Sequence, residues 1–190
     1  MNHFFILSLP RCRTLWLSLF LTTDKSFCYH DSINLIKNLD EYLELFKIDG
    51  KEYVGDSSSA NILMSKFLLK TFPFAKMFII NRNVEDVVKS LTDAGHIVTA
   101  QELSLLNLCA KELKELSKIF PSAEFTEINK DVIKEMWEYF FPTISFDKNR
   151  YELFNKAFIQ LKDVEDRNIE KYLSQFHVDI ETLKLFQGGI

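Results

Sequence analysis

Short apolar runs alternate with segments of helical periodicity, and this alternation limits the folds open to the chain. Residues 4–7, Phe-Phe-Ile-Leu, form a continuous apolar run of the kind buried on both faces of a parallel sheet, and Thr14–Thr22 then has the pattern of a helix. The strongest strand signal is Ala75–Asn81. After Arg82, apolar residues recur at helical spacing, at Val84, Val87, Val88 and Leu91.

The remaining segments continue this alternation. Further strands are predicted at Ser26–His30, Glu52–Asp56 and Glu124–Asn129. Further helices are predicted at about Ser32–Phe46, at Asn61–Lys70 and from Ala100 to about Ile119, and the chain from Asp131 onward is predicted to be mainly helical. Strands that alternate with helices form a mostly parallel sheet covered on both faces, with ligands beyond the carboxyl ends of the strands. We therefore expect a three-layer α/β fold with a helical C-terminal third.

Composition adds limits on size, location and partners. A chain of 190 residues with 47% hydrophobic residues and only five Gly and four Pro fits one domain, residues 1–190. Three cysteines without metal-type spacing make no disulfide framework, which favours a reducing, cytoplasmic location. The net charge of −4 argues against nucleic acid as a partner, so an anion site must be built locally.

The first apolar stretch is also the first candidate site. Arg11 and Arg13 interrupt the apolar residues between Phe4 and Leu21, so we interpret this stretch as a strand and a helix rather than a membrane span. Backbone N–H groups at such a turn, with the helix dipole behind them, form a site for phosphate or sulfate. Two arginines and Thr14 add charge and a hydroxyl, although the alternative of surface cations on a polar turn stays open.

That turn is not a Walker A loop, because it contains no glycine, and this argues against an ATPase of that type. The second candidate site follows the strand Ala75–Asn81, where Arg82 and Ser90 could reach one anion from the same helix. The alternative is that Arg82 pairs with a neighbouring acid, Glu85 or Asp86. If both segments serve one ligand, they must face a common crevice.

Together, the two segments resemble motifs of sulfotransferases. Residues 8–18, SLPRCRTLWLS, are similar to the 5′-phosphosulfate loop, x-x-P-[KR]-S-G-T-T-W-L, and residues 82–90 are similar to the 3′-phosphate motif, R-N-P-x-D-x-x-x-S. Residues 125–129 resemble the Y-E-D-L strand of many members, so the resemblance covers about two-thirds of the chain. It implies a P-loop NTPase-like sheet and transfer of a sulfuryl group from 3′-phosphoadenosine 5′-phosphosulfate to a hydroxyl or amine of a small-molecule or glycan acceptor, without a metal.

The resemblance also implies residue roles. Arg11 stands where the family contacts the phosphosulfate, and Arg82 and Ser90 stand where it holds the 3′-phosphate. The loop positions are Cys12, Arg13, Thr14 and Leu15, followed by Trp16, which either flanks the adenine or lies in the core. The chain departs from the motifs at Cys12, Arg13, Leu15 and Val84, where the family usually has Ser, Gly, Thr and Pro, and no R-K-G segment is present near the C-terminus.

A base that takes the acceptor proton is the remaining requirement. His30 follows an early strand, and its ordinary pKa of about 6.5 suits this role, although it could equally be a turn histidine bonded to Asp31. Asp31 competes for the same role, and Asp56 is a third candidate whose alternative is helix capping. Cys12 between two arginines could have a lowered pKa and act as a nucleophile. The rival functions are a nucleotide-dependent phosphotransferase and a non-catalytic nucleotide-binding module.

Overall fold

A five-stranded parallel sheet organises the protein. The computed structural model describes residues 1–32 and 38–156. The strands are β1 (Asn2–Ser8), β2 (Ser26–Tyr29), β3 (Tyr53–Ser57), β4 (Lys76–Asn81) and β5 (Ser122–Glu124). Their order is β2-β3-β1-β4-β5, and every neighbouring pair is parallel. From β1 the chain runs toward the β2 edge of the sheet and from β4 toward the β5 edge, so the carboxyl ends of β1 and β4 form the switch point at which such sheets bind ligands.

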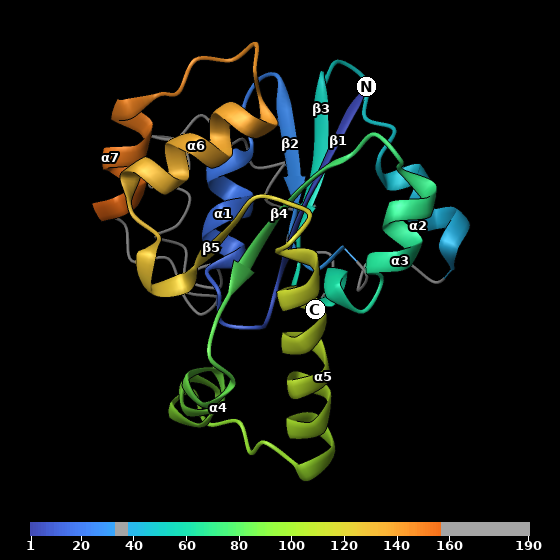
Figure 1. Ribbon diagram of the computed structural model, residues 1–190. Helices are drawn as coiled ribbons and strands as arrows, with labels where there is room; N and C mark the ends of the chain where they lie inside the picture. Colours follow the sequence, from blue (N-terminus) through green and yellow to red (C-terminus); the bar gives the residue numbers. More distant parts are fainter. Residues whose placement is uncertain (33–37, 157–190) are drawn as a thin grey trace.

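Helices cover both faces of the sheet. They are α1 (Thr14–Leu21), α2 (Leu39–Leu45), α3 (Ser65–Thr71), α4 (Val84–Asp93), α5 (Ala100–Leu116), α6 (Lys130–Phe140) and α7 (Lys148–Lys156), with 3₁₀ turns η2 (Ser59–Ile62) and η3 (Phe125–Glu127). Figure 1 shows α1, α6 and α7 on one side of the sheet and α2 and α3 on the other. In the same view, α4 lies beyond the carboxyl ends of the strands. This arrangement confirms the predicted three-layer α/β fold.

The central strand β1 joins the two halves of the core because its side chains alternate between the faces. Phe4 packs on Phe140 and Phe141 at the end of α6, with ring centroids 4.9 and 5.1 Å apart. Phe5 points the other way and packs on Phe46 and Phe72, each at 5.3 Å between centroids. The strand at the centre of the sheet is thereby fixed from both sides, and with it the position of the loop that follows.

Two predicted elements end or break earlier than the sequence pattern suggests. The helix predicted at Asn61–Lys70 is divided into η2 and α3, because Asn61 is buried and its amide donates to the carbonyl oxygens of Ile6 and Asp56, each at 3.2 Å. These bonds tie the turn to the sheet rather than continue a helix.

The strand predicted at Glu124–Asn129 is wrong, since β5 ends at Glu124 and the chain turns through η3. Asn129 then caps α6 by accepting the backbone N–H groups of Asp131 and Val132. The alternating apolar residues of this segment therefore lie in a turn and next to the start of a helix.

The rest of the helical pattern is found as expected within the described residues. Of the helix predicted at Ser32–Phe46, the part described is Leu39–Leu45, begun by Asn38 as N-cap; residues 33–37 lie outside the described residues. The helical C-terminal third is present as α6 and α7, and residues 157–190 also lie outside. No helix among the described residues combines the length and the apolar character needed to cross a bilayer.

Candidate functional site

The loop between β1 and α1 has an unusual backbone. Arg11 and Arg13 have φ values of 65° and 59°, in the left-handed region that residues other than glycine rarely adopt. Left-handed residues are a component of the backbone nests that bind anions, and here two of them lie on either side of Cys12. Arg13 is the N-cap of α1 and makes no side-chain cap, and the first turn of α1 holds no acidic residue. The loop thus presents N–H groups, a helix dipole and cations together.

The conformation of Arg13 leads to a stability prediction. A left-handed residue with a Cβ costs about 1–2 kcal/mol, and glycine avoids this strain. Arg13→Gly is expected to raise the free energy of unfolding by about 1 kcal/mol in urea titration. Arg13→Ala is the matched control, because it removes the same charge but keeps the Cβ. Equal stability of the two variants would show that the loop backbone is not strained at this position.

Arg82 and Ser90 meet this loop directly. The Nε–H of Arg11 donates to the hydroxyl of Ser90 at 3.2 Å, and the guanidinium of Arg82 donates to the backbone carbonyl of Arg11. The Cζ of Arg82 lies 4.1 Å from the centroid of the Phe125 ring, and its Nε is buried without a hydrogen-bond partner among the described residues. The two segments predicted from sequence therefore lie at one edge of the sheet, with their side chains in contact.

This arrangement differs from the alternative of local ion pairs. Within the described residues, Arg82 forms no ion pair with Glu85 or Asp86. A cavity of about 910 Å³ also borders Arg82, between α4 and α5, and is lined in part by Val88, Lys89, Leu103 and Lys114. The guanidinium of Arg82 thus contacts the loop and the Phe125 ring, while Glu85 and Glu124 line the same cavity without forming an ion pair with it among the described residues.

His30 lies where the loops that follow β1, β2 and β3 meet. Its Nε2 lies 3.1 Å from the hydroxyl of Thr14, and its Nδ1 lies 3.4 Å from a carboxylate oxygen of Asp31. The hydroxyl of Ser58 donates to the other oxygen of Asp31 at 3.0 Å. Burial lowers the pKa of His30, and the nearby Asp31 opposes this shift only in part. The imidazole is therefore neutral at pH 7, which leaves one ring nitrogen with a lone pair that can accept a proton.

Asp56 has a different environment from Asp31. Its side chain is fully buried, the hydroxyl of Ser32 donates to Oδ2, and Oδ1 has no partner among the described residues. Burial raises the pKa of Asp56 to about 8. The capping role falls to Ser58, which accepts the backbone N–H of Ala60 at 3.2 Å. Asp56 is thus a protonated acid beneath the surface, and Asp31 is the carboxyl group that contacts His30.

The raised pKa of Asp56 leads to a pH prediction. An unfolded chain releases this proton above about pH 4, whereas the folded protein keeps it up to about pH 8, so stability is lost as the pH rises through this window. Asp56→Asn removes the titration. We expect its free energy of unfolding, relative to that of the wild type, to rise by on the order of 1 kcal/mol per pH unit between pH 5 and pH 8.

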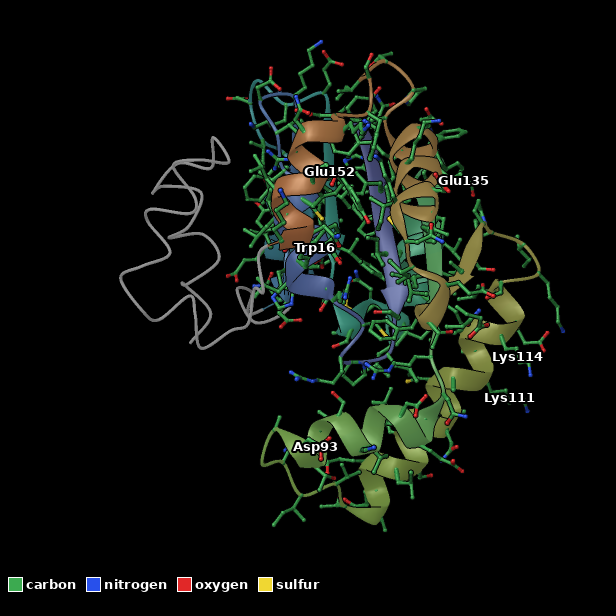
Figure 2. The ribbon with its side chains drawn as sticks, turned by 90° about the vertical axis from the view of Figure 1, so that its left-hand side faces the viewer. Trp16, Asp93, Lys111, Lys114, Glu135 and Glu152 are labelled. Atoms are coloured by element: carbon green, nitrogen blue, oxygen red, sulfur yellow. The ribbon has the colours of Figure 1, made fainter. Side chains whose placement is uncertain are left out.

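Urea titrations at several pH values measure this difference. Asp93→Asn, at the exposed end of α4 (Figure 2), is the control and should show no such trend. A constant difference between Asp56→Asn and the wild type would contradict the buried-acid assignment.

Two of the predicted loop residues point into the protein. Cys12 is buried, and burial raises the pKa of its thiol to about 12, so the predicted lowering is wrong and no thiolate forms near neutral pH. The indole N–H of Trp16 donates to the carbonyl of Phe154 at 2.9 Å, and its ring stacks on Phe20 with centroids 5.0 Å apart. Trp16 therefore occupies the core position between α1 and α7 (Figure 2), the alternative that the sequence left open.

Sequence reasoning gave Ser32 no role, because an isolated serine in a polar turn carries no pattern, and it gave Ser58, within the run Ser57–Ser59, only a helix-capping role. Their positions after β2 and β3 could have marked them, since both loops lie at the carboxyl edge. The described residues include no group of three or more His, Cys, Asp or Glu side chains that could hold a metal ion.

Comparisons with known proteins identify the fold. No family model matches the chain. No curated protein matches it either. Among solved structures, a sulfotransferase from Alicyclobacillus acidocaldarius is 16% identical with a TM-score of 0.56, over 97% of this chain and 99% of that chain. The sulfotransferase domain from the Synechococcus PCC 7002 olefin synthase is 12% identical with a TM-score of 0.58, over 98% and 94%. The chain thus has the fold of these sulfotransferases.

Proposed function

We propose that this protein is a single-domain sulfotransferase, residues 1–190, that uses 3′-phosphoadenosine 5′-phosphosulfate and transfers its sulfuryl group to a hydroxyl or amine of a small-molecule or glycan acceptor. The observation that carries the proposal is the junction of Arg11, Arg82 and Ser90 at the carboxyl edge of a sheet with the sulfotransferase fold. These groups come from two segments whose sequences resemble the two donor-binding motifs.

The donor would be held at both of its anionic groups. Arg82 and Ser90 would bind the 3′-phosphate, and the buried Nε–H of Arg82 has no partner among the described residues. The nest of the β1–α1 loop, with Arg11, Arg13 and Thr14, would bind the phosphosulfate. Cys12 and Leu15 would take part only through the backbone, because their side chains pack inward. The contact between Arg11 and Ser90 would be exchanged for contacts to the donor.

The chemistry follows from these groups. The acceptor oxygen or nitrogen attacks sulfur, the bond from sulfur to the bridging phosphate oxygen breaks, and adenosine 3′,5′-bisphosphate leaves. Arg11 and the loop N–H groups stabilise charge on the departing phosphate. Neutral His30 takes the acceptor proton at Nε2, and Asp31 stabilises the imidazolium that results. A sulfuryl group carries less charge than a phosphoryl group, so cations and N–H groups suffice without a metal ion.

The test is an assay with radiolabelled donor and a broad panel of alcohols, phenols, amines and glycans. We expect label in an acceptor and stoichiometric adenosine 3′,5′-bisphosphate, unchanged by a chelator. Phosphoryl transfer from ATP that needs Mg²⁺ would favour the phosphotransferase. Donor binding with no labelled acceptor would favour the non-catalytic module.

A further inference from the structure

Ser58 is hydrogen-bonded to Asp31, whose other carboxylate oxygen lies 3.4 Å from Nδ1 of the proposed base, His30. It lies directly after β3, is fully buried, and makes two bonds with one hydroxyl: it donates to Oδ1 of Asp31 at 3.0 Å and accepts the backbone N–H of Ala60 at 3.2 Å. The second bond fixes where the hydroxyl oxygen lies. The first bond can therefore hold one oxygen of Asp31 in place while the other faces His30.

The backbone of Asp31 shows that this placement has a conformational cost. Its φ of 51° is in the left-handed region, which aspartate adopts more readily than most residues but still at some expense. Its side chain is 40% exposed, so water would compete for the carboxylate if nothing held it. Ser58 supplies a buried donor on the side away from the imidazole, and this favours the orientation that contacts Nδ1.

The tautomer of His30 follows from this orientation. A carboxylate oxygen 3.4 Å from Nδ1 favours the tautomer with the hydrogen on that nitrogen, because the negative charge attracts an N–H group and repels a lone pair. Nε2 then has the lone pair, and the hydroxyl of Thr14 donates to it. Without Asp31 at Nδ1, the two neutral tautomers would compete and part of the population would present Nε2–H, which cannot accept a proton.

We propose that Ser58 is a positioning residue that acts through Asp31 to keep His30 in the tautomer whose Nε2 accepts a proton. Its effect on turnover rests on the proposed function, whereas its effect on the imidazole does not. Ser58 touches neither donor nor acceptor in this scheme. The other carboxyl group nearby, Asp56, is fully buried, and burial raises its pKa to about 8, which favours its neutral form near pH 7.

Nitrogen-15 NMR of the imidazole rings tests the proposal in the ligand-free protein at pH 7.5. The wild type should show His30 mainly with hydrogen on Nδ1. Ser58→Ala should show a mixture of tautomers, and the pKa of His30 should fall further because Asp31 no longer opposes the effect of burial. Ser58→Gly is a second variant that removes the hydroxyl but keeps a residue tolerated at an N-cap. Ser58→Thr should restore the wild-type spectrum, and Ser59→Ala, the neighbouring serine, should leave it unchanged.

The kinetic result separates the two proposals. In the sulfuryl-transfer assay, Ser58→Gly should lower kcat about tenfold with little change in KM for the donor, since only the base is affected. A wild-type tautomer and pKa in both Ser58→Ala and Ser58→Gly would overturn the positioning role, whatever the activity. Altered tautomers in a protein that transfers no sulfuryl group would support the positioning role and count against the proposed function.

Discussion

Arg82→Ala is expected to weaken the binding of adenosine 3′,5′-bisphosphate by about 10- to 100-fold in calorimetric titration, in line with the 1.5–3 kcal/mol typical of hydrogen bonds to charged groups. The guanidinium has a buried Nε–H without a partner among the described residues, lies over Phe125 and is bonded to the carbonyl of Arg11. A phosphate that accepts hydrogen bonds from the planar guanidinium gains both an ion pair and a fixed bidentate geometry. Alanine removes both and also releases the loop carbonyl.

Two further variants identify the source of the loss. Arg82→Lys keeps the charge but not the fork, so its affinity should lie between those of the wild type and Arg82→Ala. Ser90→Ala should cost less, about 1 kcal/mol, because it removes one neutral hydroxyl. Wild-type binding that survives both Arg82→Ala and Ser90→Ala would reject the 3′-phosphate site assigned to these residues.

His30→Gln is expected to lower the rate of sulfuryl transfer by about 10²- to 10⁴-fold, the range typical of a general base, while nucleotide affinity stays within a factor of two or so of the wild type. The imidazole contacts Thr14 and Asp31 rather than Arg82 or Ser90, so the base and the 3′-phosphate site are separable. Since burial lowers the pKa of His30, the acidic fall in the wild-type rate should lie below pH 6.5.

The matched control is His96→Gln. His96 is exposed and its ring contacts Glu102 at the surface, 3.0 Å away, so this variant should keep the wild-type rate and pH profile. A His30→Gln enzyme with undiminished turnover would exclude His30 as the base and would return Asp31 to first place.

Much of the fold was predictable because its strands are short apolar runs between polar turns. Residues 4–7 lie within β1, and Lys76–Asn81 forms β4 almost as expected, since both are buried strands with flanking turns. The parallel sheet followed from the alternation with helices. The two candidate anion-binding segments were found from their places after β1 and β4, which depend on chain order and not on the contacts of their side chains.

The remaining features depend on burial and contacts that no local pattern contains. The segment after β5 is apolar enough to suggest a strand, but Phe125 lies under Arg82, and Asn129 is needed as a helix cap. The pKa values of Cys12 and Asp56 are raised by desolvation, and the sequence shows only their charged or polar neighbours. The role proposed for Ser58 depends on its hydrogen bond to Asp31, which is 27 residues away in the chain.

Arg11 and Ser90, whose side chains touch, are 79 residues apart in the chain, and β3 enters the sheet between the two segments in sequence. During synthesis, Arg11 and Arg13 emerge long before β4, the strand that precedes Arg82. Until β4 pairs with β1, Arg82 and Ser90 are not held beside Arg11, so the proposed nucleotide site is incomplete. The proposed donor binding would thus require the two paired strands and not either motif alone.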